Sequence, residues 1–200
     1  IACDQYTSQP EYWAETDRIV GDAPSTLRLT LPEVYLEEVD VAARTETIHK
    51  TMRRYIEEGT LQTLPAGIIL TERWSGGACP RRGIVLAMDL EAYEYTPGSA
   101  SLIRPTEKTV VERIPPRLKV RQGACMELPH IMILIDDPDR TIIEPLFEKT
   151  ASFDRIYDTD LMQNGGHITG WFIPKGVETD TVEAGLEALC DRAAFNQKYG

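Results

Sequence analysis

The sequence has no long hydrophobic run and too few positive charges to balance its negative ones. Its longest uninterrupted apolar runs, which include residues 131–135, hold five residues, far short of the roughly 20 that span a bilayer. Lys and Arg number 21 against 32 Asp and Glu, which gives a formal net charge of −11. Because nonspecific nucleic-acid binding needs a basic face, we expect neither a nucleic-acid partner nor a membrane partner.

Cysteine is scarce and widely spaced. The four cysteines are Cys3, Cys79, Cys125 and Cys190, and the nearest two are 46 positions apart. Zinc ribbons and redox dithiols need close CxxC pairs, so the spacing argues against both. We therefore expect free, buried thiols and, because no signal peptide is present, a cytoplasmic protein. Since the chain begins with Ile1 rather than Met, we also expect it to be a fragment of a longer protein.

Several catalytic motifs are absent. The sequence contains no GxxxxGK[ST] phosphate loop, no GxGxxG after a strand, no HExxH pair and no GxSxG nucleophile elbow. The three histidines are far apart in the chain. These absences exclude the standard P-loop hydrolases, dinucleotide-binding domains, zinc peptidases and serine hydrolases that such motifs identify.

The apolar patterns predict a single α+β domain over residues 1–200, with a mixed, largely antiparallel sheet and three to four helices. Capping residues and apolar stripes predict helices over residues 10–20, over 40–58 and from Asp180 onward. About seven short strands are expected, at residues 27–31, 67–74, 83–95, 100–104, 130–136, 153–161 and 167–173. Asn164-Gly165 predicts the turn of a hairpin between the last two strands.

A local basic stretch interrupts the acidic sequence. Residues 103–123 carry six basic side chains against two acidic ones, so they either pair with acidic neighbours or receive an anion. The planar guanidinium group of arginine can donate two hydrogen bonds to one phosphate. Arg117 and Arg121 would lie on the same face of a helix if this segment is helical. The predicted phosphate or nucleotide ligands are Arg104, Thr106, Thr109, Arg113, Arg117 and Arg121.

Glu107 lies among these cations, which would keep it ionised. It is therefore predicted to bind Mg²⁺ or to accept a proton as a catalytic residue. The alternative for the whole stretch is a solvated helix whose arginines pair with surface carboxylates.

A polar loop precedes the first predicted helix. Asp4 is a candidate general base, and Gln5, Tyr6 and Thr7 are candidate substrate-binding residues, because helix N-termini attract anions. The alternative is ordinary helix capping with a turn at Asp4.

Two histidines at predicted strand starts are further candidates for substrate binding. His167 follows the predicted hairpin turn, and His130 precedes the apolar run at 131–135. The alternatives are a plain hairpin turn for His167 and a structural core position for His130.

Longer segments of the chain resemble the "domain of unknown function 1015" family. The resemblance covers nearly the whole chain and is carried by residues 2–13, by 104–146, by 124–137 with Glu127-Leu128-Pro129-His130, and by Gly165-Gly166-His167. The family is similar to the ParB/sulfiredoxin-like fold group, which includes nucleotide-dependent free-serine kinases. The resemblance thus implies ParB/sulfiredoxin-like elements, Mg²⁺ with ADP or ATP, and phosphoryl transfer to a small hydroxylated metabolite.

Two departures from the family pattern bear on this function. Many relatives carry His-Glu-x-Thr, where this chain has Thr106-Glu107-Lys108-Thr109. Relatives also carry an Asp-Gly-(Asn/His)-His segment, which would be expected just beyond Gly200. Three functions therefore stay open: a small-molecule kinase, a non-catalytic nucleotide or small-anion sensing module, and a structural or interaction domain.

Overall fold

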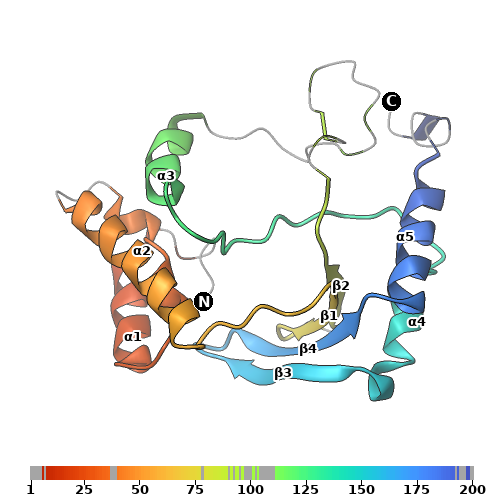
Figure 1. The fold of residues 1–200 in the computed structure, drawn as a ribbon, viewed down its shortest axis with the longest axis horizontal. Coiled ribbons are helices and arrows are strands. Elements are labelled where there is room, and N and C mark those ends of the chain that lie inside the picture. The colour runs from red at the N-terminus through yellow and green to blue at the C-terminus, as the bar shows by residue number, and fades with distance from the viewer. Residues whose placement is uncertain are drawn as a thin grey trace. The chain divides into compact units, whose positions relative to one another are not determined.

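The computed structural model describes residues 6, 8–36, 40–77, 79–89, 91, 93–94, 96, 101, 103, 111–191, 193 and 197–198. The chain's contacts divide it into two compact units. The first unit comprises residues 1–63 and 109–132, and the second comprises residues 64–108 and 133–200. Figure 1 shows the elements of each unit in chain order.

The first unit is helical where it is described. Its α-helices are α1 (Pro10–Val20), α2 (Val41–Glu57) and α3 (Ile114–Arg121), and its 3₁₀ helices are η1 (Thr26–Leu29), η2 (Glu33–Tyr35) and η4 (Val111–Arg113). The helices predicted over residues 10–20 and 40–58 are confirmed. Ile48, Met52 and Tyr55 of α2 follow the i, i+4, i+7 spacing and are buried against Leu29 of η1.

The strand predicted over residues 27–31 is wrong, because this segment begins as a 3₁₀ helix. The Ser25 hydroxyl accepts a hydrogen bond from the Leu27 N–H at 3.2 Å and so caps the turn. Only Leu29 is buried, at 2% exposure, against α2. The alternation of Leu with Arg and Thr therefore reflects one buried residue of a short helical turn rather than one face of a strand.

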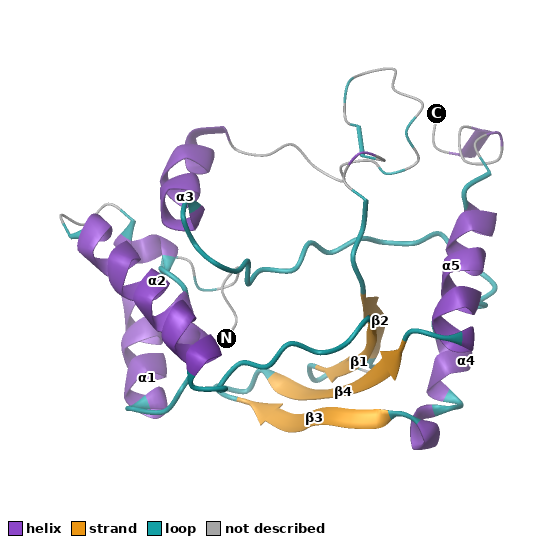
Figure 2. Cartoon of the chain, viewed as in Figure 1, coloured by secondary structure: helices purple, strands orange, loops and turns teal. Residues whose placement is uncertain are grey.

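The second unit is built on a four-stranded antiparallel sheet (Figure 2). Its strands are β1 (Gly67–Trp74), β2 (Arg81–Val85), β3 (Asp154–Leu161) and β4 (Gly166–Pro174), in the order β2-β1-β4-β3. The α+β class is therefore confirmed, as is the hairpin joined through Asn164-Gly165. Among the described residues the sheet has four strands, fewer than the seven expected.

Helices cover one face of this sheet. Ile142, Leu146 of α4 (Glu144–Phe147) and Val182 of α5 (Val177–Leu189) are buried against the sheet residues Ile68, Leu70 and Ile173. Helix α5 begins at Val177 rather than at the predicted Asp180. The Thr179 hydroxyl accepts from the Gly176 N–H at 2.9 Å and donates to the Gly176 carbonyl at 2.8 Å, which fixes the earlier start.

The strand predicted over residues 130–136 is also wrong. The apolar side chains of residues 131–135 are between 37% and 77% exposed, and no strand of the described part of the chain pairs with them. A strand forms only where a neighbour accepts its main-chain hydrogen bonds, and hydrophobicity alone does not supply that neighbour.

Two smaller expectations also change. Strand β2 ends at Val85, and among the described residues that follow it Tyr93 forms an isolated bridge to Ile103. The thiols of Cys79, Cys125 and Cys190 are free, as expected, but exposed rather than buried, and Cys3 lies outside the described residues. Within the described segments, no helix has the length and apolar character needed to cross a membrane.

Candidate functional site

Most of the predicted catalytic and phosphate-binding residues fall outside the described part of the chain. These are Asp4, Arg104, Thr106, Glu107 and Thr109, and the side chain of Arg113 is not described either. The predicted substrate-binding residues Gln5 and Thr7 also lie outside the described residues. Of the opening loop, Tyr6 is described, and its ring stacks on Tyr12 with centroids 4.0 Å apart. The Tyr6 carbonyl accepts a hydrogen bond from the Trp13 indole at 2.9 Å, so Tyr6 anchors the start of α1.

The arginines of α3 are paired with carboxylates of the chain itself. The Arg117 Nη2 donates to the Glu33 Oε2 at 3.0 Å, and the Arg121 Nε lies 3.4 Å from the Glu127 Oε1. The two guanidinium side chains are 48% and 50% exposed. Their geometry therefore matches the alternative expectation, a solvated helix whose arginines pair with surface carboxylates.

The two candidate histidines lie in different surroundings. His130 is exposed and stands in an irregular segment, so its predicted position at the head of a strand is wrong. His167 is the second residue of β4, directly after the hairpin turn, as predicted. Of the predicted substrate-binding residues in the described segments, His167 is the one that lies among other reactive side chains.

The register of the β3–β4 hairpin brings two carboxylates to His167. Asp160 is the cross-strand partner of His167, and Asp158 is the partner of Thr169. The His167 Nδ1 lies 2.7 Å from the Asp160 Oδ1, and the Nε2 lies 2.7 Å from the Asp158 Oδ1. The Thr169 hydroxyl adds a longer hydrogen bond to Asp158 at 3.4 Å. We call Asp158, Asp160, His167 and Thr169 the hairpin cluster.

The hairpin cluster lies on the same sheet face as the hydrophobic core, but further along the strands. Cross-strand partners share a face and side chains alternate, so His167 and Thr169 of β4 lie on the side that also carries Trp171 and Ile173. The core end of this face is packed against α4 and α5. The hairpin end is partly exposed and polar, which is where a ligand can approach.

The electrostatics of the cluster favour a protonated imidazole. A carboxylate can only accept, so hydrogen bonds from both ring nitrogens need both of them to carry a proton. The hydrogen bonds to Asp160 and to Asp158 raise the pKa of His167 above its usual 6.5. The hydrogen bond from His167 lowers the pKa of Asp158, and the Arg155 guanidinium 2.6 Å away lowers it further.

This arrangement supplies a cation and a proton acceptor next to each other. The Asp160 side chain is 92% exposed, so it can take a proton from an approaching hydroxyl. The His167 imidazolium is 40% exposed and can neutralise developing negative charge beside it. Within the described segments, no group of three or more His, Cys, Asp or Glu residues is arranged to hold a metal ion.

Two glycines of β4 allow the hairpin to form. Gly166 has a φ of +89°, and a Cβ there would lie 1.7 Å from the Trp74 carbonyl oxygen. A Cβ at Gly170 would lie 2.1 Å from the Tyr157 ring, which covers it on the face opposite the cluster. Burial raises the pKa of the Tyr157 phenol. The strand can therefore pass close to both neighbours only because these positions lack side chains.

Sequence reasoning missed Asp158 and Asp160. A two-residue turn at Asn164-Gly165 would pair residue 162 with residue 167, whereas the hairpin pairs residue 160 with residue 167, so the turn indicates the correct face of the sheet but not the register. The spacing of two between the aspartates then puts both on the histidine's face. The register shift between Arg155 and Tyr157 lies before both aspartates and so leaves this relation intact.

The helices and the four-stranded antiparallel sheet place the protein in the α+β class. The chain belongs to the family described as "Protein of unknown function (DUF1015)", whose model matches residues 1–192. Neither the curated proteins nor the solved structures contain a match to this chain.

Proposed function

We propose that the protein transfers a phosphoryl group from a nucleotide to a small hydroxylated metabolite, with the hairpin cluster acting on the hydroxyl. The observation that carries this proposal is the His167 ring held 2.7 Å from a carboxylate at each nitrogen, at the exposed end of the sheet. Phosphoryl transfer needs mainly positioning and charge neutralisation, and a fixed imidazolium beside an accessible carboxylate offers both to the acceptor.

In the proposed reaction, Asp160 accepts the proton of the metabolite hydroxyl. The hydroxyl oxygen forms a bond to the γ-phosphorus, the bond from that phosphorus to the bridging oxygen breaks, and the nucleoside diphosphate leaves with the electron pair. His167 holds the carboxylate in place and offsets negative charge at the acceptor. Mg²⁺ would neutralise phosphate charge, and Glu107, which lies outside the described residues, is its proposed ligand.

The test is phosphorus NMR of the full chain with ATP, Mg²⁺ and one hydroxy compound at a time, from a panel of serine, threonine, glycerol and inositol. We expect a new phosphomonoester signal with at least one acceptor. Asp160→Asn should lower its rate of formation about 100-fold, the scale of a lost general base. His167→Gln should also lower the rate of transfer, because the Asp160 carboxylate loses the imidazole that holds it in place.

Asp154→Asn is the matched control, because Asp154 is an exposed carboxylate on the same strand but on the opposite sheet face. It should leave the rate unchanged. No transfer to any acceptor, or an unchanged rate in both Asp160→Asn and His167→Gln, would contradict the proposal.

The ion pairs of α3 favour a second candidate, in which the basic stretch has a structural role. Arg117 and Arg121 each form an ion pair with a carboxylate of their own chain. The positive charge of each guanidinium is therefore already neutralised within the protein. Calorimetry of ATP binding tests this structural role. Equal affinity in the wild type and in the Arg117→Ala, Arg121→Ala double variant supports the structural role. A loss of about tenfold or more returns these arginines to a nucleotide site.

A further inference from the structure

Trp74 brings an aromatic side chain to the same end of the sheet as the hairpin cluster. It is the last residue of β1 and the cross-strand partner of His167. Directly paired residues project to the same face, so Trp74, His167 and Asp160 form one row across β1, β4 and β3. Trp74 is 42% exposed, so part of its apolar surface faces solvent beside the two reactive groups.

A second polar row lies one step closer to the core. Thr169 of β4 stands between Asp158 of β3 and Glu72 of β1, and Glu72 is in turn the partner of Arg82 of β2. The Arg82 Nε lies 2.9 Å from the Glu72 Oε2. Leu70, in the row after that, is fully buried. The two outer rows therefore form the polar end of a face whose other end is the packed core.

Each cation of these two rows already faces a carboxylate. His167 lies between Asp158 and Asp160, and Arg82 is paired with Glu72. A substrate that carries its own carboxylate or phosphate would need an unpaired cation, and the described side chains of the two rows supply none. Their charges therefore favour a neutral acceptor over a hydroxy acid or an amino acid.

The first row separates an apolar surface from a hydrogen-bond acceptor. Both nitrogens of His167 contact carboxylates of β3, so its ring leans toward β3 and leaves the β1 side to Trp74. Neighbouring strands lie about 4.8 Å apart, which puts Trp74 and Asp160, two strands apart, at a separation of about 10 Å. A saturated six-membered ring with its hydroxyls spans such a distance.

The two ends of the row have complementary preferences. The contact with His167 uses the Asp160 Oδ1, and the side chain is 92% exposed, so its Oδ2 is accessible. A carboxylate only accepts hydrogen bonds and therefore suits hydroxyl groups. The face of an indole ring is electron-rich and attracts the C–H groups of a saturated ring that lies on it.

We propose that the acceptor is a neutral ring-shaped polyol, a sugar or a cyclitol, bound between Trp74 and Asp160. The C–H face of its ring lies on the indole, and the hydroxyl that receives the phosphoryl group donates its hydrogen bond to Asp160. This inference rests on the proposed function, because it names the acceptor used at that same site. Trp74 is then the residue that selects a ring over an open chain.

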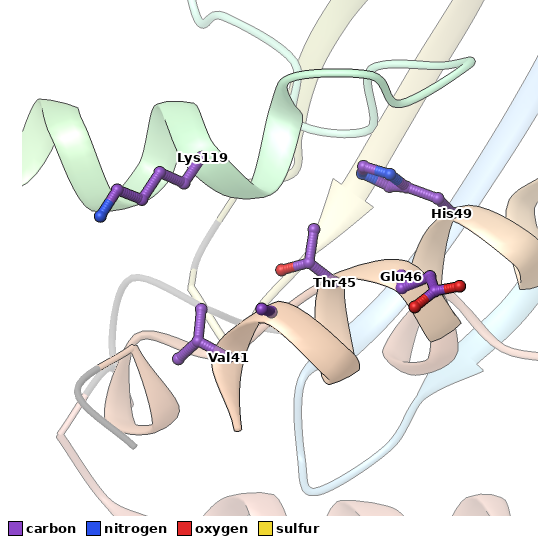
Figure 3. Close-up of a pocket in the computed structure, with 6 residues that line it drawn as sticks. Val41, Thr45, Glu46, His49 and Lys119 are labelled. Atoms are coloured by element: carbon purple, nitrogen blue, oxygen red, sulfur yellow. The ribbon is translucent and has the colours of Figure 1, made fainter. Parts of the chain in front are cut away.

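A depression of the first unit, between α2 and α3, lacks these features. It is lined by Val41, Ala42, Thr45, Glu46, His49 and Lys119. Figure 3 shows the Lys119 ammonium directed away from Thr45 and His49. Glu46 is the one lining carboxylate, and its Oε1 already lies 2.7 Å from the Lys50 Nζ. The polyol is therefore assigned to the sheet and not to this depression.

The test is an NMR titration of the indole N–H signals of the full chain, without nucleotide, using myo-inositol, mannitol and serine. The first two probes carry the same number of hydroxyls, but only myo-inositol is a ring. The chain has three tryptophans, and Trp74→Phe identifies the Trp74 signal by removing it. We expect myo-inositol to shift that signal saturably, mannitol to bind about tenfold more weakly and serine to leave it unmoved. Trp13, which is 2% exposed, is the internal control and should not respond.

Calorimetry of variants then isolates the aromatic face. Trp74→Phe keeps an aromatic ring and should bind myo-inositol within about threefold of the wild type, whereas Trp74→Leu should weaken it about tenfold or more. Asp154→Asn, on the opposite sheet face, should bind like the wild type. If Trp74→Leu does not fold, the comparison of myo-inositol with mannitol on the wild type still decides.

Equal binding of myo-inositol and mannitol, a shift of the Trp74 signal by serine as large as that by myo-inositol, or unchanged affinity in a folded Trp74→Leu would overturn the inference. Phosphorus NMR with ATP separates this result from the proposed function. Myo-inositol that binds at Trp74 but is never phosphorylated contradicts the transfer and leaves the ring site standing. Phosphorylation of serine or glycerol alone, at a rate that Trp74→Leu does not change, supports the transfer and overturns the ring site.

Discussion

The Asp158 carboxylate and the His167 imidazole face each other across β3 and β4, with their Oδ1 and Nε2 atoms 2.7 Å apart. Asp160 holds the other ring nitrogen at the same distance. The imidazole therefore links two positions of β3 from a single position of β4. This places charge and a proton-accepting group at the end of the sheet that the helices leave open.

The first prediction concerns the pH dependence of stability. The pKa of His167 is raised above 6.5 in the folded protein, so the folded state binds the proton more tightly than the unfolded state. The resulting stabilisation is fully present below the unfolded pKa of about 6.5 and is lost as pH rises through the folded pKa. Urea unfolding of the wild type and His167→Gln, from about pH 5 to about pH 9, measures it.

The free energy of unfolding should differ most between the two proteins at the acid end and least at the alkaline end. Asp158 does not reverse this trend, because its lowered pKa keeps it ionised throughout that range. A difference that stays constant or grows with pH would show that His167 is not held as an imidazolium.

The second prediction concerns the close approach of Tyr157 to Gly170. An alanine Cβ at position 170 would lie 2.1 Å from the Tyr157 ring, so Gly170→Ala should destabilise the protein by about 1–3 kcal/mol. Gly77→Ala is the control, because its Cβ would have no neighbour nearer than 3.9 Å. Combining Gly170→Ala with Tyr157→Ala should cost less than the sum of the two single changes; additive costs would argue against the contact.

The third prediction concerns the ion pairs of α3. Arg117→Ala and Arg121→Ala should each change the free energy of unfolding by less than about 1 kcal/mol, because both pairs are solvent-exposed. Leu29→Ala is the contrasting variant of the same unit, since Leu29 is 2% exposed and its truncation should cost about 2–5 kcal/mol. A loss of several kcal/mol in either arginine variant would mean that the pairs hold the unit together.

The elements that the sequence predicted well are those defined by local patterns. Helix α2 has a continuous apolar stripe, and the β3–β4 hairpin has its Asn164-Gly165 turn. The failures arose where distant partners decide the structure. Residues 131–135 are apolar enough for a buried strand but pair with no described strand, and Leu29 is buried by α2 rather than by a sheet.

The candidate site could be predicted only in part for the same reason. His167 was identified from its place after the turn, but its partners Asp158 and Asp160 depend on strand register. Arg117 and Arg121 were identified from charge, whereas the carboxylates that pair with them come from other parts of the chain. Composition thus indicates which groups are charged, and only the fold shows which of them neutralise one another.

The most direct test of the account is an NMR titration of the His167 imidazole in the wild type and in Asp160→Asn. The account predicts a midpoint above 6.5 in the wild type, because carboxylates hold both nitrogens, and a lower midpoint once the Asp160 charge is removed. A midpoint at or below 6.5 in the wild type, or one that does not move in Asp160→Asn, would contradict the hairpin cluster as described.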